Sequence, residues 1–324
     1  MLIRRIRETA QKLAGKGVSL GIGDDCALLR PRKGEEFAIT TDLSIAGRHF
    51  LIGLHPPEVV GHRAVARGLS DLAAMGAQPV AAFLSLGLPH DLAIAKGSVK
   101  SWVDRFYEGL LALAARYETS LAGGDLAESP IALADIVLVG TVPAGKALLR
   151  SGARAGDALY VTGSLGGAAA GLAVLKKWGE KRVSTAIPKR LAAGIAAHLF
   201  PQPRVAQGVW LRRKGMATAA VDVSDGLSTD LGHLCEESGV AAEVDAALLP
   251  VHSTANLEEA LHGGEDYELL FTAPQRAKVP KAIEGVAVTR IGSIGRRRRG
   301  MPQVTLRTEK ETAPLAPAGW QHFQ

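Results

Sequence analysis

Strand-like and helix-like stretches alternate in both halves of this chain, and one polar break separates the halves. The strand-like stretches are rich in β-branched and apolar residues, and the helix-like ones carry apolar residues at three- and four-residue spacing. The strand-like stretches are 36–42, 79–89, 134–142, 157–163, 217–225 and 267–273. The helix-like stretches are 58–76, 98–117, 166–179, 185–198, 203–213 and 226–239. Around residues 144–156 the pattern gives way to a polar, Gly-containing segment. These features predict a mixed α/β fold in two domains, 1–145 and 146–324.

The composition is that of a globular protein with more residues than one core usually serves. The 324 residues are 47% hydrophobic, 22% charged and 5% aromatic. No apolar run is long enough to span a bilayer, and the opening MLIRRIRETAQKLAG interleaves charges where a signal peptide needs an apolar stretch. We therefore expect a cytoplasmic protein with no membrane partner. The two cysteines, Cys26 and Cys235, lack metal-type spacing and are interpreted as reduced, small core residues.

The excess of basic over acidic residues raises the question of whether the protein binds nucleic acid. The net charge is +6, and residues 296–299 are four consecutive arginines. Glycines flank this run, which is typical of a turn with solvated charges, and no aromatic residues interleave for base stacking. We expect no nucleic-acid partner. A modest excess of positive charge also suits an enzyme with polyanionic substrates.

Six short motifs place carboxylates directly after small residues, at expected strand ends, helix starts or turns. The motifs are GIGDD, TTD, LSD, GGD, VDVSD and GGED. Their acids are Asp24, Asp25, Asp42, Asp71, Asp125, Asp222, Asp225, Glu265 and Asp266. Carboxylate and hydroxyl oxygens are the ligands that Mg²⁺ takes, and neighbouring glycines let the backbone approach phosphates closely. The motifs together favour a site for magnesium and phosphate.

Other interpretations of these motifs stay open on sequence grounds. A lone GGD or SDG is most often an ordinary turn, and the six motifs could lie at opposite ends of the molecule. If the acids converge, cations must offset their repulsion. The segment GSLGG at 163–167 either holds phosphate at a helix N-terminus or closes a tight turn, and the turn is favoured. The sequence lacks GxxxxGK[ST], the protein-kinase motifs, GxSxG and zinc spacings, which argues against those chemistries.

An ordered series of motifs resembles the thiamine-monophosphate kinases, a family in the aminoimidazole-ribonucleotide synthetase-like superfamily. The series is GIGDDCALL, TTDLSIAGRHF, GLSDLAAMGAQPVAAFLSLGLP, AGGDL, LLRSGARAGDALYVTG, VDVSDGLSTDL, HGGEDYELLFT and the terminal GWQHF. The resemblance runs from about residue 20 to the last few residues. It implies a two-domain α/β architecture, a homodimer formed through the N-terminal sheets, ATP as co-substrate and several Mg²⁺ ions. Thr40 stands where Ser is also common in the family.

The resemblance also implies roles for individual residues. Magnesium ligands are implied at Asp25, Thr40, Thr41, Asp42, Asp71, Asp125, Asp222 and Asp225, with Asp42 and Asp71 as the catalytic pair. ATP contacts are implied at Gly124, Asp125, Arg150 and Ser224, and thiamine monophosphate contacts at His49, Glu265 and Trp320. The flat face of Trp320 suits the pyrimidine or the thiazolium charge, although simple packing is the alternative.

The implied activity is direct in-line transfer of the γ-phosphoryl group of ATP to thiamine monophosphate, the last step of thiamine diphosphate biosynthesis. Alternatives are another ATP-using enzyme of the superfamily or a non-catalytic nucleotide- or metal-binding module. Hydrogenase-maturation dehydratases need a C-terminal cysteine, whereas this chain ends in WQHFQ. Selenophosphate synthetases need a reactive Cys or selenocysteine in an early Gly-rich loop, and Cys26 directly after GIGDD is a different arrangement.

Overall fold

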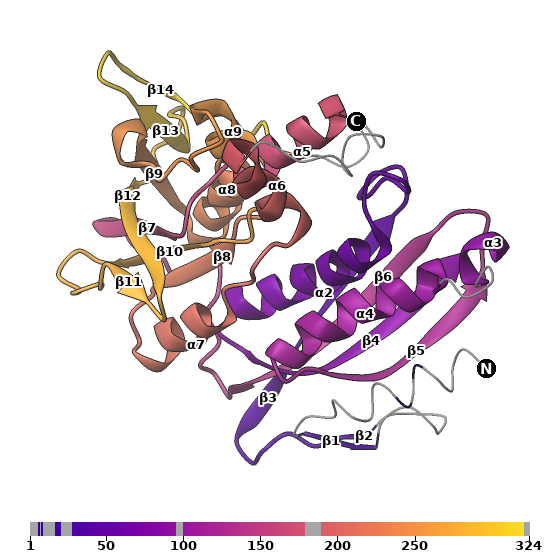
Figure 1. Cartoon of the computed structure of the whole chain (residues 1–324). Coiled ribbons are helices and arrows are strands. Elements are labelled where there is room, and N and C mark those ends of the chain that lie inside the picture. The colour runs from indigo at the N-terminus through magenta and orange to yellow at the C-terminus, as the bar shows by residue number, and fades with distance from the viewer. Residues whose placement is uncertain are drawn as a thin grey trace. The chain divides into compact units, whose positions relative to one another are not determined.

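The chain forms two compact units, each a mixture of helices and strands, as predicted. A computed structural model describes residues 6, 8, 17–20, 28–94, 100–178 and 189–320. The first unit comprises Met1–Leu72 and Ala77–Gly145, and the second comprises Ala73–Gly76 and Lys146–Gln324. Figure 1 shows the elements of both units in chain order.

The first unit is built on a four-stranded sheet in the order β3-β6-β4-β5. The β4–β5 pair is parallel, and β6 runs antiparallel to both of its neighbours. Its strands are β3 (Glu35–Ile45), β4 (Gln78–Leu88), β5 (Ser120–Glu128) and β6 (Leu133–Pro143), with β1 (Val18–Leu20) and β2 (Leu28–Leu29) pairing separately. Its helices are α2 (Pro57–Ala74), α3 (His90–Ala93) and α4 (Trp102–Arg116).

Helices α2 and α4 lie side by side on one face of this sheet (Figure 1). Helix α2 starts at Pro57, whose fixed φ suits a first helical turn, and Ser101 and Asp104 form a capping box at the start of α4. The helices meet closely at two glycines, because a Cβ on Gly61 would lie 2.0 Å from the Phe106 carbonyl oxygen and one on Gly109 would lie 1.8 Å from that of Glu58. Fully buried Leu69, Leu110 and Leu138 pack in this unit's interior.

The second unit contains an eight-stranded, mostly antiparallel sheet in the order β14-β13-β9-β12-β7-β10-β8, with β11 paired to β12. Its strands are β7 (Asp157–Thr162), β8 (Ala219–Asp222), β9 (Val240–Asp245), β10 (Leu269–Pro274), β11 (Ala282–Ile283), β12 (Val286–Arg296), β13 (Val304–Arg307) and β14 (Thr312–Pro314). Its helices are α5 (Gly167–Trp178), α6 (Lys189–Leu199), α7 (Val205–Arg213), α8 (Leu227–Ser238), the 3-10 helix η1 (Ala246–Leu248) and α9 (Leu257–His262).

The core of the second unit lies between this sheet and helix α8. Leu231 and Leu234 of α8 belong to one buried cluster with Val161 of β7, Val221 of β8 and Leu270 of β10. Helix α8 ends at Gly239 in the left-handed conformation, a common helix stop. The loops at the start of α8 and before β10 carry several of the predicted site residues.

Most predicted strands and helices are present, and Asp71 lies on its predicted helix, but the expectation that TTD and GGD stand at strand ends or turns was wrong. Asp42 lies inside β3 and Asp125 inside β5, and Asp71 lies inside α2. The ladder between β3 and β6 continues over eleven residue pairs, so TTD does not end its strand. The acids of the first unit therefore project from continuous strands and a helix.

Candidate active site

Strand β3 and helix α2 bring three of the predicted metal ligands together. The Thr40 hydroxyl donates a hydrogen bond to Asp71 Oδ2. Asp42 leaves β3 on the same face as Thr40, because side chains two residues apart in a strand share a face. The Arg67 guanidinium, one helical turn before Asp71, has Nε 3.5 Å from Asp42 Oδ1. The arrangement forms a small acidic cluster with the Arg67 guanidinium beside it.

Asp42 has the least favourable electrostatic environment in this cluster. The pKa of its carboxyl is raised to about 7, chiefly by burial and next by the Asp71 carboxylate, with Arg67 opposing the rise. Its Oδ2 atom is buried and has no hydrogen-bond partner among the described residues. A buried carboxylate oxygen without a partner is costly, and a cation bridging Asp42 and Asp71 would relieve both the burial and the repulsion. The donor set of two carboxylates and a hydroxyl suits Mg²⁺.

Asp135 is an acid near this cluster that the sequence interpretation missed. It lies on β6, beside the Asp42 position of β3, and its charge also raises the pKa of Asp42. In the sequence, Asp135 is the one acid in the apolar stretch ADIVLVGTV. No glycine or hydroxyl residue directly precedes it, so it did not match the pattern of the six acidic motifs. Strand pairing was needed to place it next to Asp42.

Thr41 and Asp125 lie on the opposite face of the same sheet. The ladder aligns Thr41 with Val137, Phe83 and Gly123, and the next row aligns Leu43, Asp135, Ser85 and Asp125. Directly opposed residues share a face, and alternate residues along a strand do too. Within the first unit, therefore, Thr40, Asp42 and Asp71 come together, and the side chains of Thr41 and Asp125 do not join them.

A pocket at the β5 edge contains the predicted ATP contacts Gly124 and Asp125. Its lining comprises Ile6, Leu84, Tyr107, Leu121, Gly123, Gly124, Asp125 and Leu126. Gly124 has φ +149, and a Cβ there would lie 2.0 Å from the Leu84 carbonyl oxygen, so the position requires glycine. Tyr107 of α4 was not predicted from the sequence, where it looked like one apolar position of an amphipathic helix. An aromatic and aliphatic lining beside a glycine and a carboxylate suits a nucleotide base.

His49 follows β3 and is held by the backbone. The Ile45 amide donates to His49 Nδ1 at 3.0 Å, so the neutral ring carries its proton on Nε2. The Arg63 guanidinium approaches the His49 carbonyl oxygen at 3.5 Å. These contacts fix the ring in an orientation where Nε2–H is the donor.

In the second unit, Asp222 is the last residue of β8, and Ser224 and Asp225 lie on the segment that joins β8 to α8. Asp230, in the first turn of α8, holds this segment: its Oδ2 accepts from the amides of Ser224, Asp225 and Gly226 at 3.0, 3.0 and 3.1 Å. The pKa of Asp230 is raised to about 7, chiefly by burial and next by the Asp225 charge, with the three amides opposing the rise. Asp230 was not singled out in the sequence, where it appeared as one more helix residue.

The GGED loop is joined to that segment by main-chain hydrogen bonds. The Glu265 amide donates to Ser224 O at 2.8 Å, and the Tyr267 amide donates to Val223 O at 2.9 Å. Glu265 and Tyr267 have φ values of 69° and 51°, which are strained for residues with side chains. Glu265 Oε2 is 3.6 Å from Nδ1 of His198, a buried residue of α6. The Glu265 carboxylate therefore lies against the His198 ring.

Asp266 has a structural role at the start of α5. Its carboxylate accepts from the Gly166 amide at 2.6 Å and the Ala168 amide at 3.1 Å. Burial raises its pKa to about 7, against the effect of these two amides. The helix N-terminus that GSLGG leads into is therefore capped by a protein carboxylate, which supports the turn interpretation of GSLGG over phosphate binding.

Trp320 lies beside the Asp225 segment, and Arg150 does not. The Trp320 amide donates to Asp225 O at 3.0 Å, and the Gly319 amide donates to Thr229 Oγ1 at 3.2 Å. The indole is 46% exposed, so it remains available to a ligand. The Arg150 carbonyl oxygen accepts from Ser238 Oγ at the far end of α8, roughly 18 Å of helix away from Ser224.

The structure leaves two parts of the predicted metal site open: the GIGDD acids and a complete set of protein ligands. Asp24 and Asp25 lie outside the described residues. Among the residues that the structure describes, no three His, Cys, Asp or Glu side chains are grouped closely enough to hold a metal ion on their own. A metal at Asp42 and Asp71 would need further ligands, and Mg²⁺ usually takes waters and substrate phosphates.

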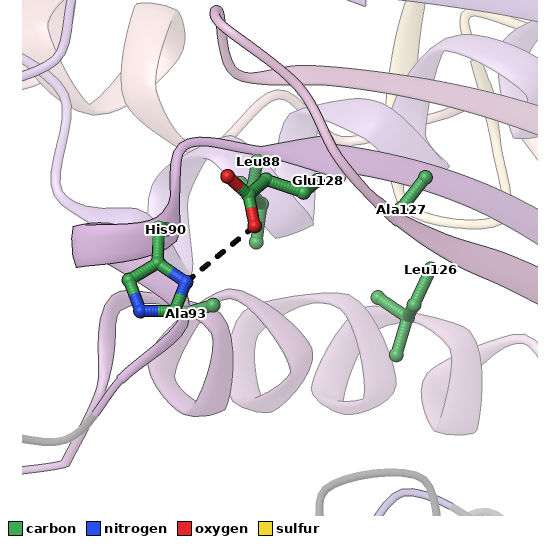
Figure 2. A pocket seen from close by; sticks show the side chains of 6 residues that line it. All are labelled: Leu88, His90, Ala93, Leu126, Ala127 and Glu128. Carbon is green, nitrogen blue, oxygen red and sulfur yellow. Dashed lines mark ion pairs between the residues drawn. The ribbon is translucent and has the colours of Figure 1, made fainter.

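A second hollow lies at the ends of β4 and β5 (Figure 2). His90 and Glu128 point toward one another there, with Nδ1 3.5 Å from Oε2, and both side chains are largely exposed. An exposed ion pair contributes little to stability, and no predicted site residue lines this hollow.

The described part of the chain contains no helix with the length and apolar character needed to cross a membrane.

The sequence of this chain is similar to those of known proteins. The sequence matches the families described as AIR synthase related protein, N-terminal domain, over residues 23–143, and AIR synthase related protein, C-terminal domain, over residues 154–304. It is 41% identical to thiamine-monophosphate kinase of Escherichia coli strain K12, over 94% of this chain and 92% of that protein. These matches cover both predicted domains.

Solved structures extend the likeness to three dimensions. The crystal structure of thiamine-monophosphate kinase from Stenotrophomonas maltophilia K279a has a TM-score of 0.79 and 36% identity, and 96% of each chain is covered. AaThiL complexed with AMPPCP and TMP has a TM-score of 0.77 and 32% identity, covering 99% of this chain and 96% of that one. The chain therefore belongs to the thiamine-monophosphate kinase family of the AIR synthase related proteins.

Proposed function

We propose that this protein catalyses the ATP-dependent phosphorylation of thiamine monophosphate to thiamine diphosphate. The relatives that carry this name are similar over nearly the whole chain, and AaThiL is complexed with an ATP analogue and TMP. The observation in this protein that carries the proposal is the Thr40–Asp42–Asp71 cluster. In it, the buried Oδ2 of Asp42 has no hydrogen-bond partner among the described residues. Such a cluster suits a cation-dependent transfer between two polyanions.

We assign magnesium to the acids of both units. Asp42, Asp71 and Thr40 supply one group of ligands, and their burial and mutual repulsion fit a cation between them. The remaining ligands of the proposal are Asp25, Thr41, Asp125, Asp222 and Asp225. Bound magnesium offsets negative charge on the phosphates of nucleophile, transferred group and leaving group. Several ions are proposed, because these acids belong to separate groups.

The protein's own residues position the two substrates. Gly124, Asp125 and Tyr107 line the proposed nucleotide pocket of the first unit. Arg150 and Ser224 of the second unit are kept as proposed ATP contacts. His49 offers Nε2–H, Glu265 a carboxylate and Trp320 an aromatic face to thiamine monophosphate. A phosphate monoester has a second pKa of about 6, so its oxygen is already ionised at neutral pH and needs little help from a base. Transfer is then direct and in line, with no covalent enzyme intermediate.

We also propose a homodimer formed through the sheet of the first unit. One face of β3 exposes Phe37, Ile39 and Leu43, which are 40%, 63% and 45% accessible. Three large apolar side chains in one row of an edge strand are typical of a surface that a partner covers. Replacing Ile39 with Asp is expected to shift the protein from dimer to monomer in sedimentation velocity. We place the enzyme in the cytoplasm.

The test of the function is product formation. The protein is incubated with ATP, Mg²⁺ and thiamine monophosphate, and thiamine diphosphate and ADP are quantified. Parallel reactions contain thiamine or no acceptor. Equal amounts of ADP and thiamine diphosphate that appear only with thiamine monophosphate support the proposal. ATP binding without acceptor-dependent turnover would favour a related enzyme of the superfamily or a binding module.

A further inference from the structure

Residues 315–320, which follow β14, form a strap that runs from the sheet of the second unit to helix α8. The Leu315 amide donates to Val304 O of β13 at 3.0 Å, and the Leu315 side chain belongs to the buried core of this unit. Farther along the strap, Pro317 lies beside Gly232 of α8, because a Cβ on that glycine would be 3.9 Å from Pro317 Cγ. The 315–320 strap is therefore packed against the helix.

Two hydroxyl groups of α8 hold the next part of the strap. The Ala318 amide donates to Ser228 Oγ at 3.4 Å, and the Gly319 amide donates to Thr229 Oγ1 at 3.2 Å. Ser228 is fully buried and Thr229 is 7% accessible. Ser228 Oγ is also hydrogen-bonded to His262 Nδ1 of α9 at 2.8 Å. Consecutive amides bound by consecutive helix residues fix the register of the strap on α8.

Gly319 fits this position because it lacks a side chain. A Cβ there would lie 1.9 Å from Asp225 O and 2.7 Å from Thr229 Oγ1. The Asp225 main chain is itself held in place, because its amide donates to Asp230 Oδ2 at 3.0 Å. A larger residue at position 319 would therefore lift the strap, and with it Trp320, away from the helix.

The strap attaches Trp320 next to Glu265, the other proposed contact to thiamine monophosphate in this unit. The Trp320 amide donates to Asp225 O at 3.0 Å, and the Glu265 amide donates to Ser224 O at 2.8 Å. Two adjacent carbonyl groups thus carry the aromatic residue and the acid. An aromatic face and a carboxylate held at a fixed separation suit a cationic heteroaromatic ring.

We infer that Ser228, Thr229 and Gly319 are positioning residues that set the affinity for thiamine monophosphate by holding Trp320. This inference rests on the proposed function, which assigns Trp320 to that substrate. The three residues fix the main chain that leads to the indole. Losing their contacts should weaken binding of the thiazolium ring, whereas the metal ligands that serve phosphoryl transfer stay in place. The KM for thiamine monophosphate should therefore rise while kcat changes little.

The inference is tested with Thr229→Val, Thr229→Ser and Gly319→Ala. Valine keeps the branched shape of threonine but removes the acceptor of the Gly319 amide, and serine keeps that acceptor. We expect the KM for thiamine monophosphate to rise about tenfold in Thr229→Val and Gly319→Ala, with kcat and the KM for ATP within about twofold of wild type. Thr229→Ser should stay near wild type. A KM for ATP that rises in step with that for thiamine monophosphate would overturn the inference.

The matched control is Gly295→Ala. This exposed glycine of β12 has no atom within 4 Å of an added Cβ, so the same substitution should leave all three kinetic constants unchanged.

Combining Gly319→Ala with Trp320→Ala separates positioning from a general loss of structure. If Gly319 acts through the indole, the double variant should have the same KM for thiamine monophosphate as Trp320→Ala alone. Effects of the two substitutions that simply add would contradict the inference.

A second readout does not depend on turnover. Equilibrium dialysis of thiamine monophosphate with Mg²⁺ should give the same Kd for wild type and Thr229→Ser and an about tenfold higher Kd for Thr229→Val. A wild-type protein that binds in this pattern but makes no thiamine diphosphate would refute the proposed reaction and leave the positioning role standing. Turnover by wild type together with unweakened binding by Thr229→Val would refute the positioning role alone, and a wild type that binds no thiamine monophosphate would refute both.

Discussion

The buried acids of the two units differ in what satisfies them, although burial raises the pKa of Asp42, Asp230 and Asp266 alike to about 7. In the second unit, Asp230 accepts three backbone amides and Asp266 accepts two. In the first unit, Asp42 has a distant Arg67 contact, a like charge in Asp71 and one oxygen without a hydrogen bond among the described residues. A raised pKa alone therefore does not distinguish a ligand from a structural acid.

On the proposed function, this difference separates the acids that stabilise the fold from those that would bind a cation. Amides that converge on a carboxylate order a loop or a helix start, and removing the carboxylate leaves them unsatisfied. A carboxylate that is buried without such donors destabilises the protein until a cation arrives. Substitution of Asp42 should therefore mainly lower turnover, and substitution of Asp266 should mainly lower the free energy of unfolding.

Asp42→Asn should have the largest effect on turnover. The substitution keeps the shape of the side chain but removes the charge, and we expect kcat to fall on the order of a thousandfold, equivalent to about 4 kcal/mol. The free energy of unfolding without metal should stay the same or rise, because the repulsion with Asp71 disappears. Steady-state kinetics and urea unfolding measure the two quantities. Near-normal turnover would remove Asp42 from the proposed cluster.

Asp266→Ala should produce the opposite pattern. The amides of Gly166 and Ala168 lose their acceptor at the start of α5, and we expect a loss of about 2 kcal/mol in the free energy of unfolding. Turnover per folded molecule should change far less than in Asp42→Asn. Urea unfolding at pH 6 is the measurement, with the exposed Glu309→Ala as a control for loss of a surface acid. A stable Asp266→Ala protein that lacks activity would reverse the assignment of this residue.

The cost of Asp266→Ala should also depend on pH. The pKa of Asp266 is about 7 in the folded protein against an ordinary value of 3.8, so between these values the folded state binds more protons than the unfolded state. The contribution of Asp266 to stability is therefore fully present below pH 4 and is lost as the pH rises through 7. We expect the difference in unfolding free energy between wild type and Asp266→Ala to shrink from pH 5 to pH 8, measured without metal. A difference that grows over this range would contradict the raised pKa.

The sequence predicted the elements of this fold better than the arrangement of its site. Apolar spacing and caps such as Pro57 and Ser101 are local, so they were sufficient to predict α2 and α4. Strand order and register are not local. The pairing of β3 with β6, and the bulge after Ala82 that aligns Phe83 with Gly123, decide that Asp42 and Asp125 face opposite ways.

The same limit explains the residues that were missed. Tyr107 and Asp230 appeared as ordinary helix positions, because a pocket at a strand edge and three converging amides exist only after folding. The motif LSTDL contains no sign that its Asp turns back to the preceding loop. The resemblance names Asp42 and Asp125 as ligands, but only the paired strands place these two residues in neighbouring rows on opposite faces of the sheet.

Asp230→Asn should have the smallest effect of the series. One oxygen of Asp230 accepts all three amides, and Asn retains an oxygen that can do the same while the repulsion with Asp225 is removed. We expect kcat to change less than about threefold in Asp230→Asn. Asp230→Ala leaves the three amides without their acceptor, so it should lower the free energy of unfolding and reduce kcat by about tenfold or more. Steady-state kinetics of the two variants measure the contrast. If Asn were as damaging as Ala, the charge rather than the hydrogen-bonded turn would matter, and Asp230 would belong with Asp42 among the acids that serve a cation.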